Sequence, residues 1–122
     1  MILVDSSGWI EYLAARPKAH LFAPYIEGSE PLLSSVIQVY EIYKVVRRDV
    51  NEERAIEAVS ALRRTTIEPL VDSLALEAAD IALEHGLAMA DAIILATALR
   101  HDAEIVTGDV DFDGLPGVTL IR

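Results

Sequence analysis

Several acidic side chains in this sequence stand directly after apolar runs that are typical of buried strands. Asp5 follows the run at 2–4, and Asp109 and Asp111 follow a second run at 104–107. An aspartate after a strand is often only a turn residue or a helix cap. If the two strands are parallel, however, their carboxyl ends meet at one edge of a sheet, and these acids lie together there.

Two more acids interrupt segments whose apolar residues have helical spacing. Glu41 has Ile37 and Val45 one turn away, and Asp91 lies one turn before Ile94 in an alanine-rich segment. A carboxylate is seldom buried without a partner. Glu41 can still reach solvent from the edge of its helix, and Asp91 can stabilise the first turn of its helix through the macrodipole. Either acid can instead belong to a shared site.

Carboxylates gathered at one poorly hydrated edge repel one another, so they either take up protons or bind a cation. The sequence has no cysteine, and its three histidines show no metal-ligand spacing. An all-oxygen set favours Mg²⁺ or Mn²⁺ over zinc. One or two such ions activate water and stabilise the leaving oxygen in phosphodiester hydrolysis. These acids therefore predict hydrolytic phosphate chemistry.

The elements that would position the acids alternate along the chain. Short strands are expected at 2–4, 32–33, 65–67, 104–107 and 118–121, with helical segments between them. Residues 5–8 are expected to form a turn, because the helical spacing begins only at Trp9. Such alternation predicts an α/β fold, a three-layer α/β/α sandwich of Rossmann-like type around a mostly parallel five-stranded sheet. Ligands in such folds bind beyond the carboxyl ends of the strands.

The order of these motifs resembles the PIN-domain ribonucleases, most closely the VapC-type toxins of bacterial and archaeal toxin–antitoxin pairs. The similarity is carried by the segment ILVDSSGWIEYL at 2–13, by Glu41, and by the segments at 90–98 and 106–112. It runs in the right order from residue 2 to about residue 112. The resemblance implies a single PIN domain over residues 1–122 that cleaves single-stranded regions of RNA, leaving 5′-phosphate and 3′-hydroxyl ends.

The resemblance also implies which residues act and which partners bind. Thr107 would orient a carboxylate or a metal-bound water, Ser6 or Ser7 would assist at the same position, and Asp111 is a further candidate accessory residue. The partners would be a VapB-like antitoxin, whose C-terminal segment enters the active-site groove, and a second copy of the chain in a homodimer. An acidic quartet would hold one or two Mg²⁺ or Mn²⁺ ions: Asp5, Glu41, Asp91 and Asp109.

The charge balance opposes a nucleic-acid partner. Ten Lys and Arg residues stand against 20 Asp and Glu residues, a formal net charge of −10 at pH 7, and setting the four proposed ligands aside leaves −6. Basic residues are nevertheless clustered at Lys44, Arg47 and Arg48, near the end of an expected helix. They are either favourable cations at a helix C-terminus or contacts to RNA phosphates.

Two other functions fit parts of the pattern. A doubly wound phosphoryl-transfer or phosphatase-like domain also places an aspartate after its first strand, but a haloacid-dehalogenase-type phosphatase would need a second one at the position of Ser7. The other alternative is a non-catalytic PIN-like module that only binds metal.

The sequence also predicts where the chain works. It has no run of about 20 apolar residues that could span a membrane. Its start also lacks the regions of an export signal. A cytoplasmic protein without membrane contact is therefore expected.

Overall fold

The computed structural model describes all residues from 1 to 122 and contains six α-helices, one short 3₁₀ helix and five strands. The strands are β1 (Ile2–Val4), β2 (Leu32–Ser35), β3 (Thr66–Glu68), β4 (Glu104–Thr107) and β5 (Val118–Leu120). The helices are α1 (Ser6–Leu13), α2 (Ala19–Ile26), α3 (Val36–Asp49), α4 (Glu52–Leu62), α5 (Asp72–His85), α6 (Met89–Arg100) and the 3₁₀ helix η1 (Val110–Phe112).

The five strands form one sheet in the order β3-β2-β1-β4-β5, and every pairing is parallel. The predicted α/β fold is confirmed, and the sheet is wholly parallel rather than mostly so. From β1 the chain continues to β2 on one side, whereas β4 lies on the other side of β1 and continues to β5. The connections therefore reverse between β1 and β4, and ligands in open parallel sheets bind at this switch point.

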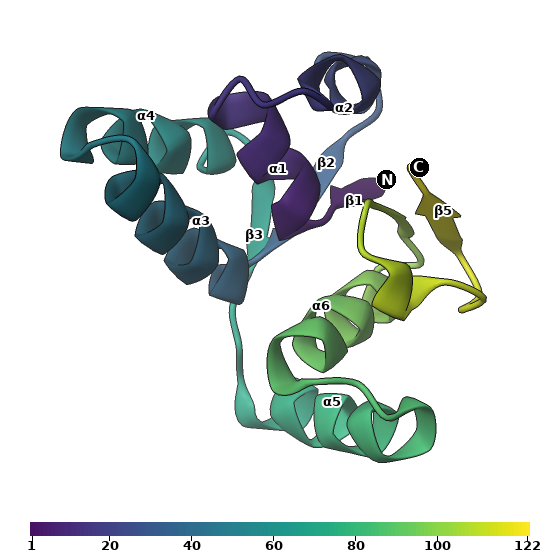
Figure 1. Ribbon diagram of the computed structural model, residues 1–122. Helices are drawn as coiled ribbons and strands as arrows, with labels where there is room; N and C mark the ends of the chain where they lie inside the picture. The colour runs from purple at the N-terminus through teal and green to yellow at the C-terminus, as the bar shows by residue number, and fades with distance from the viewer.

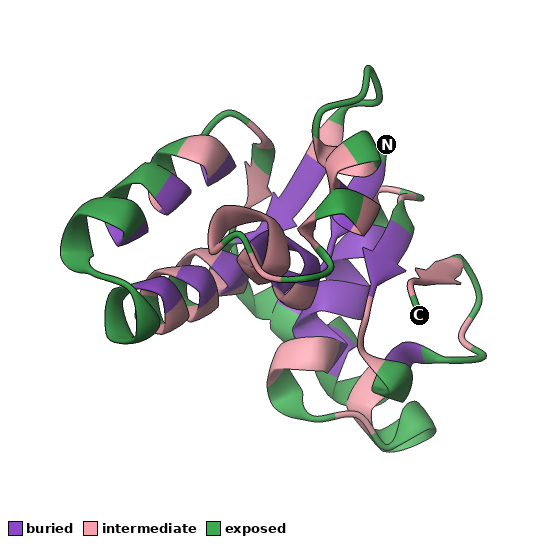
Figure 2. Ribbon diagram, turned by 45° about the horizontal axis from the view of Figure 1, so that its top comes forward, coloured by how far each residue is buried: buried purple, intermediate pink, exposed green.

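The alternation of side chains along β1 explains the three layers. Ile2 and Val4 face a core made with α1 to α4, which includes Trp9 and Phe22. Leu3 faces the other side, where it packs against α6 and η1. Figure 1 shows α5 and α6 on the side of the sheet opposite α1, and Figure 2 shows the buried residues in the central strands and on the inward sides of the helices.

The start of α1 corrects one prediction from the sequence. Residues 5–8 were expected to form a turn, but the helix already begins at Ser6, and Gly8 lies inside it. Glycine is required there for packing, because a Cβ atom on Gly8 would lie 2.5 Å from the Phe22 ring and 2.8 Å from Val4. The Ser-Ser-Gly sequence thus allows close approach of α1 to α2 and β1 instead of forming a turn.

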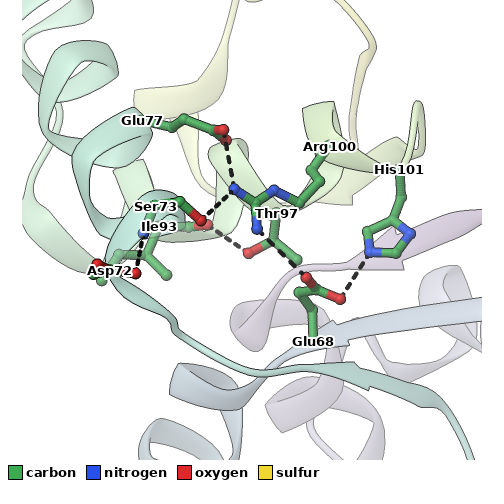
Figure 3. Close-up of polar contacts among 8 residues, drawn as sticks. All are labelled: Glu68, Asp72, Ser73, Glu77, Ile93, Thr97, Arg100 and His101. Carbon is green, nitrogen blue, oxygen red and sulfur yellow. Dashed lines mark hydrogen bonds and ion pairs between the residues drawn. The ribbon is translucent and has the colours of Figure 1, made fainter.

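The α5–α6 pair is tied to the edge of the sheet by a polar network (Figure 3). Arg100 donates to Glu77 at 3.0 Å and to Ser73 at 3.3 Å, and its guanidinium lies 3.8 Å from Glu68 on β3. His101 also contacts Glu68, at 3.0 Å. Glu68 thereby joins the end of α6 to an edge strand.

No single helix is long and apolar enough to cross a bilayer. Only α5 and α6 taken together, bent by 113° at their junction, carry enough apolar length.

Candidate metal centre

Asp5 lies at the centre of the candidate site, directly after β1 and next to the end of β4. It is only 4% exposed. The Thr107 hydroxyl donates to Asp5 Oδ2 at 2.7 Å, and the Ser7 hydroxyl donates to the same oxygen at 3.2 Å. Both hydroxyls thus act on one oxygen and fix the orientation of the carboxylate, while Oδ1 has no side-chain donor.

Glu41 is brought to Asp5 by the way α3 begins. Ser35 and Gln38 form a capping box at the start of α3, and the Gln38 amide also donates to the Val4 carbonyl at 2.8 Å, next to Asp5. One turn further along α3, Glu41 Oε1 accepts a hydrogen bond of 2.8 Å from the Ser6 hydroxyl. Glu41 therefore faces the start of α1 and is half-buried, rather than extending into solvent at a helix edge.

Asp91, Asp109 and Asp111 form the other half of the site. Each offers a carboxylate oxygen, and these oxygens all lie within 4.8 Å of one another. The Asp109 amide donates to Thr107 Oγ1 at 3.0 Å, and the Asp111 amide donates to Asp109 Oδ1 at 2.9 Å. The loop after β4 is thus held against the Thr107 side chain, which also binds Asp5.

The two halves of the site are electrostatically coupled. Burial raises the pKa of Asp5, although hydrogen bonds from Thr107 and other groups lower it in part. Burial also raises the pKa of Glu41, and the negative charge of Asp5 raises it further. At Asp91, burial and then the charges of Asp5 and Asp109 raise the pKa to about 6. The charges of Glu41 and Asp111 also raise the pKa of Asp91. The carboxylates therefore repel one another when they are all ionised.

The donor set fits a hard divalent cation. The four acids predicted as ligands come from the ends of β1 and β4, from the second turn of α3 and from the first turn of α6, and they supply only oxygen atoms. Each keeps at least one carboxylate oxygen to which no side chain donates: Oδ1 of Asp5, Oε2 of Glu41 and both oxygens of Asp91 and of Asp109, of which Asp109 Oδ1 accepts from a backbone amide. A cation bound among them would replace the mutual repulsion with attraction.

The three basic residues predicted to contact RNA differ in their surroundings. The Lys44 ammonium lies 4.9 Å from the centre of the Tyr40 ring, and its charge lowers the pKa of Glu41, so Lys44 is close to the acidic site. Arg47 lies 3.9 Å from Glu52, and Arg48 pairs with its neighbour Asp49 at 2.7 Å. The role of all three toward RNA stays a prediction.

Sequence reasoning missed Gln38 and gave Ser7 only a minor place. Gln38 binds the Val4 carbonyl and fixes the start of α3, and Ser7 clamps the Asp5 carboxylate. The Ser-x-x-Gln spacing of Ser35 and Gln38 is typical of a capping box and could have indicated the role of Gln38 at the start of α3. Nothing in the sequence indicates the hydrogen bond from Ser7 to Asp5.

Comparison with known proteins places the chain in a family. The model of the PIN domain family matches residues 2–118, and the chain therefore belongs to the PIN domain family. A search of curated protein sequences found no match. The predicted family is thus confirmed by a match over nearly the whole chain.

Solved structures with the same fold cover the chain almost completely. A chain of a toxin–antitoxin complex from Klebsiella pneumoniae is 29% identical, with a TM-score of 0.80 and coverage of 98% of this chain and 96% of that chain. VapC20 from Mycobacterium tuberculosis, described as a sarcin-ricin loop cleaving toxin, is 18% identical, with a TM-score of 0.82 and 97% of both chains covered. VapBC-1 from nontypeable Haemophilus influenzae is 23% identical, with a TM-score of 0.70 and coverage of 100% and 98%.

Asp91→Asn is expected to stabilise the metal-free protein at pH 8 and to give no gain at pH 4. Because the folded-state pKa of Asp91 is raised to about 6 from 3.8, ionisation costs stability above about pH 6, and this cost is absent below pH 4. Asp91 makes no capping hydrogen bond that the variant would lose. After discounting for solvent screening and for the lost helix-dipole interaction, the gain is about 1 kcal/mol.

Urea unfolding in EDTA at the two pH values measures this difference. A loss of more than about 2 kcal/mol at pH 8 would show that Asp91 is a structural helix cap instead.

Proposed function

We propose that residues 1–122 form a single PIN domain that acts as a Mg²⁺- or Mn²⁺-dependent endoribonuclease on single-stranded regions of RNA. The observation that carries this proposal is the convergence of Asp5, Glu41, Asp91 and Asp109 at the switch point of the sheet. Members of the PIN domain family are generally nucleases, which supports the same conclusion. The proposed setting is the cytoplasm, where the RNA is found.

The four carboxylates would hold one or two divalent ions. Such ions, when bound, activate water and neutralise charge on the phosphate and the leaving oxygen. The role of the protein is to fix the ligands beforehand: Thr107 and Ser7 orient Asp5, and Ser6 orients Glu41. Asp111, which lies beside Asp91 and Asp109, is an accessory acid at the exposed rim of the site.

The RNA backbone would pass the site along α3. Lys44, next to Glu41, is the first of the proposed phosphate contacts, and Arg47 and Arg48 lie further along the same helix. Ion pairs already engage the two arginines, so they would have to exchange a carboxylate for a phosphate. Lys44 has no such carboxylate partner and is expected to contribute most of the three.

The test is cleavage of a labelled single-stranded RNA by the purified chain with Mn²⁺ and, separately, with EDTA. Cleavage that requires Mn²⁺ and yields 5′-phosphate ends is the expected result. The same samples are incubated with a phosphate monoester, because a phosphatase would hydrolyse that compound instead. Monoester hydrolysis without RNA cleavage would overturn the proposal, and metal binding without either reaction would indicate a non-catalytic module.

We also propose that the chain is the toxin of a VapBC-type pair. The 29% identical chain belongs to a toxin–antitoxin complex, and two of the other solved structures of the same fold are VapBC proteins bound to DNA. The proposed partner is a VapB-like antitoxin whose C-terminal segment enters the groove at the acidic site.

A homodimer would form through the outer side of α5 and α6. Leu83 is 87% exposed and Met89 is 73% exposed, and both lie on these two helices. A pocket of about 380 Å³ on the same helices has only apolar lining residues: Leu70, Ala75, Ala78, Ala79, Ala82, Met89, Ala92 and Ile93. Exposed apolar side chains of this size support an interface on these helices.

A further inference from the structure

A pocket of about 280 Å³ borders the acidic site. Its lining comes from α1, the turn before α2, α2 itself and the loop after β4: Ser7, Glu11, Lys18, Phe22, Gly108 and Asp109. Two of these residues also belong to the site already described, because Ser7 binds Asp5 and Asp109 lies beside Asp91. A chain of nucleotides that places a phosphate at the acids can therefore continue into this pocket.

Lys18 is the only cation that lines this pocket, and its ammonium is free. No carboxylate lies within 4.0 Å of it, whereas six of the ten Lys and Arg side chains have such a partner. The backbone amide of Lys18 donates to Glu11 Oε2 at 3.2 Å, which ties the turn before α2 to α1. The backbone is thus held in place while the charged end of the side chain is available for a ligand.

The other lining groups suit a sugar and phosphate. Gly108 leaves the wall of the pocket open, because a Cβ atom there would lie 3.5 Å from the Phe22 ring and 3.9 Å from the Ser7 hydroxyl. Phe22 is almost fully buried, so the pocket offers no exposed aromatic surface for base stacking. The Glu11 carboxylate can accept a hydrogen bond from a ribose hydroxyl, the group that distinguishes RNA from DNA.

We infer that this pocket holds the nucleotide next to the scissile phosphate of the RNA, with the Lys18 ammonium paired to the flanking phosphate. Lys18 is then a positioning residue that offsets the repulsion between a polyanion and a cluster of five acids. The inference rests on the proposed ribonuclease function. It adds a phosphate contact from the turn before α2 to the one proposed for Lys44 on α3.

The test compares Lys18→Ala and Lys18→Arg with the wild type in Mn²⁺-dependent cleavage of a single-stranded RNA oligonucleotide, at several salt concentrations. Arg54→Gln is the matched control, because it also removes one exposed positive charge. Arg54 lies on α4 and contacts the Leu13 carbonyl, which is at the end of α1 remote from Asp5. We expect the alanine variant to raise KM about tenfold while kcat changes less than about twofold, because one charge-assisted phosphate contact is lost. The slope of log KM against log salt should fall by about 0.7.

Further measurements separate this role from a structural one. Lys18→Arg should restore KM, Arg54→Gln should leave KM unchanged, and the Mn²⁺ affinity of the RNA-free protein should be the same in the wild type and Lys18→Ala. A Lys18→Ala variant with the KM and salt slope of Arg54→Gln would overturn the inference alone. Absence of Mn²⁺-dependent cleavage by the wild type would overturn the proposed function and the inference with it.

Discussion

Asp5→Asn should reduce Mn²⁺-dependent RNA cleavage by more than about a hundredfold while leaving the protein folded. The substitution keeps the size of the side chain but removes the charge that would bind the cation. Asp5 is buried, and Thr107 and Ser7 both donate to its Oδ2 atom. Asp5 is also the one acid of the site that is almost fully buried, at the junction of β1 and β4.

The measurement is the initial cleavage rate of a labelled single-stranded RNA at saturating Mn²⁺, with thermal unfolding as the check on folding. Asp113→Asn is the matched control. Asp113 is an exposed acid directly after η1, and its only ion pair is with Arg122, at 3.5 Å. The control should cleave at the rate of the wild type. A folded Asp5→Asn protein that retained the wild-type rate would show that Asp5 does not hold the catalytic ion.

Mn²⁺ affinity is expected to fall about tenfold between pH 7.5 and pH 5. A carboxyl group must lose its proton to bind a metal, and the pKa of Asp91 is raised to about 6 by burial and by its acidic neighbours. Below pH 6 protons therefore compete with the metal, whereas above pH 7 the affinity should level off. The raised pKa values of Asp5 and Glu41 act in the same direction. An ordinary aspartate with a pKa of 3.8 would leave the affinity almost constant over this range.

Titration calorimetry with Mn²⁺ at several pH values, in the absence of RNA, tests this dependence. Asp91→Asn should bind more weakly at pH 7.5 but lose less of its affinity on acidification, because a carboxyl group with a pKa of about 6 has been removed. Equal affinity of the wild type at pH 5 and pH 7.5 would contradict the proposed set of ligands.

The fold, and the meeting of Asp5 with Asp109, could be predicted from the sequence because both depend on local patterns. The runs at 2–4 and 104–107 are short, apolar and followed by acids, and parallel strands bring their carboxyl ends to one edge. The structure places Asp5 and Asp109 at adjacent strands accordingly. The sequence also placed Asp91 in the first turn of a helix, as α6 has it, but left open whether it only stabilises that turn or shares the site.

Other parts of the site depend on contacts between distant residues and have no local signal. The helical start at Ser6 was missed because Gly8 indicates a turn locally, whereas its function is close packing against Phe22. Whether Glu41 turned inward could not be decided from helical spacing alone. It is settled by the Ser6 hydroxyl, which belongs to a different helix. The pocket at Lys18 likewise exists only once the turn before α2 meets the loop after β4.

Anomalous X-ray diffraction from crystals of the protein soaked in Mn²⁺ would locate the cation directly. We expect a Mn²⁺ peak at the carboxyl edge of β1 and β4, bound by oxygen atoms of Asp5, Glu41, Asp91 and Asp109. Crystals that show no such peak, or a peak whose ligands exclude Asp5 and Asp91, would contradict the assignment of this edge as a metal centre.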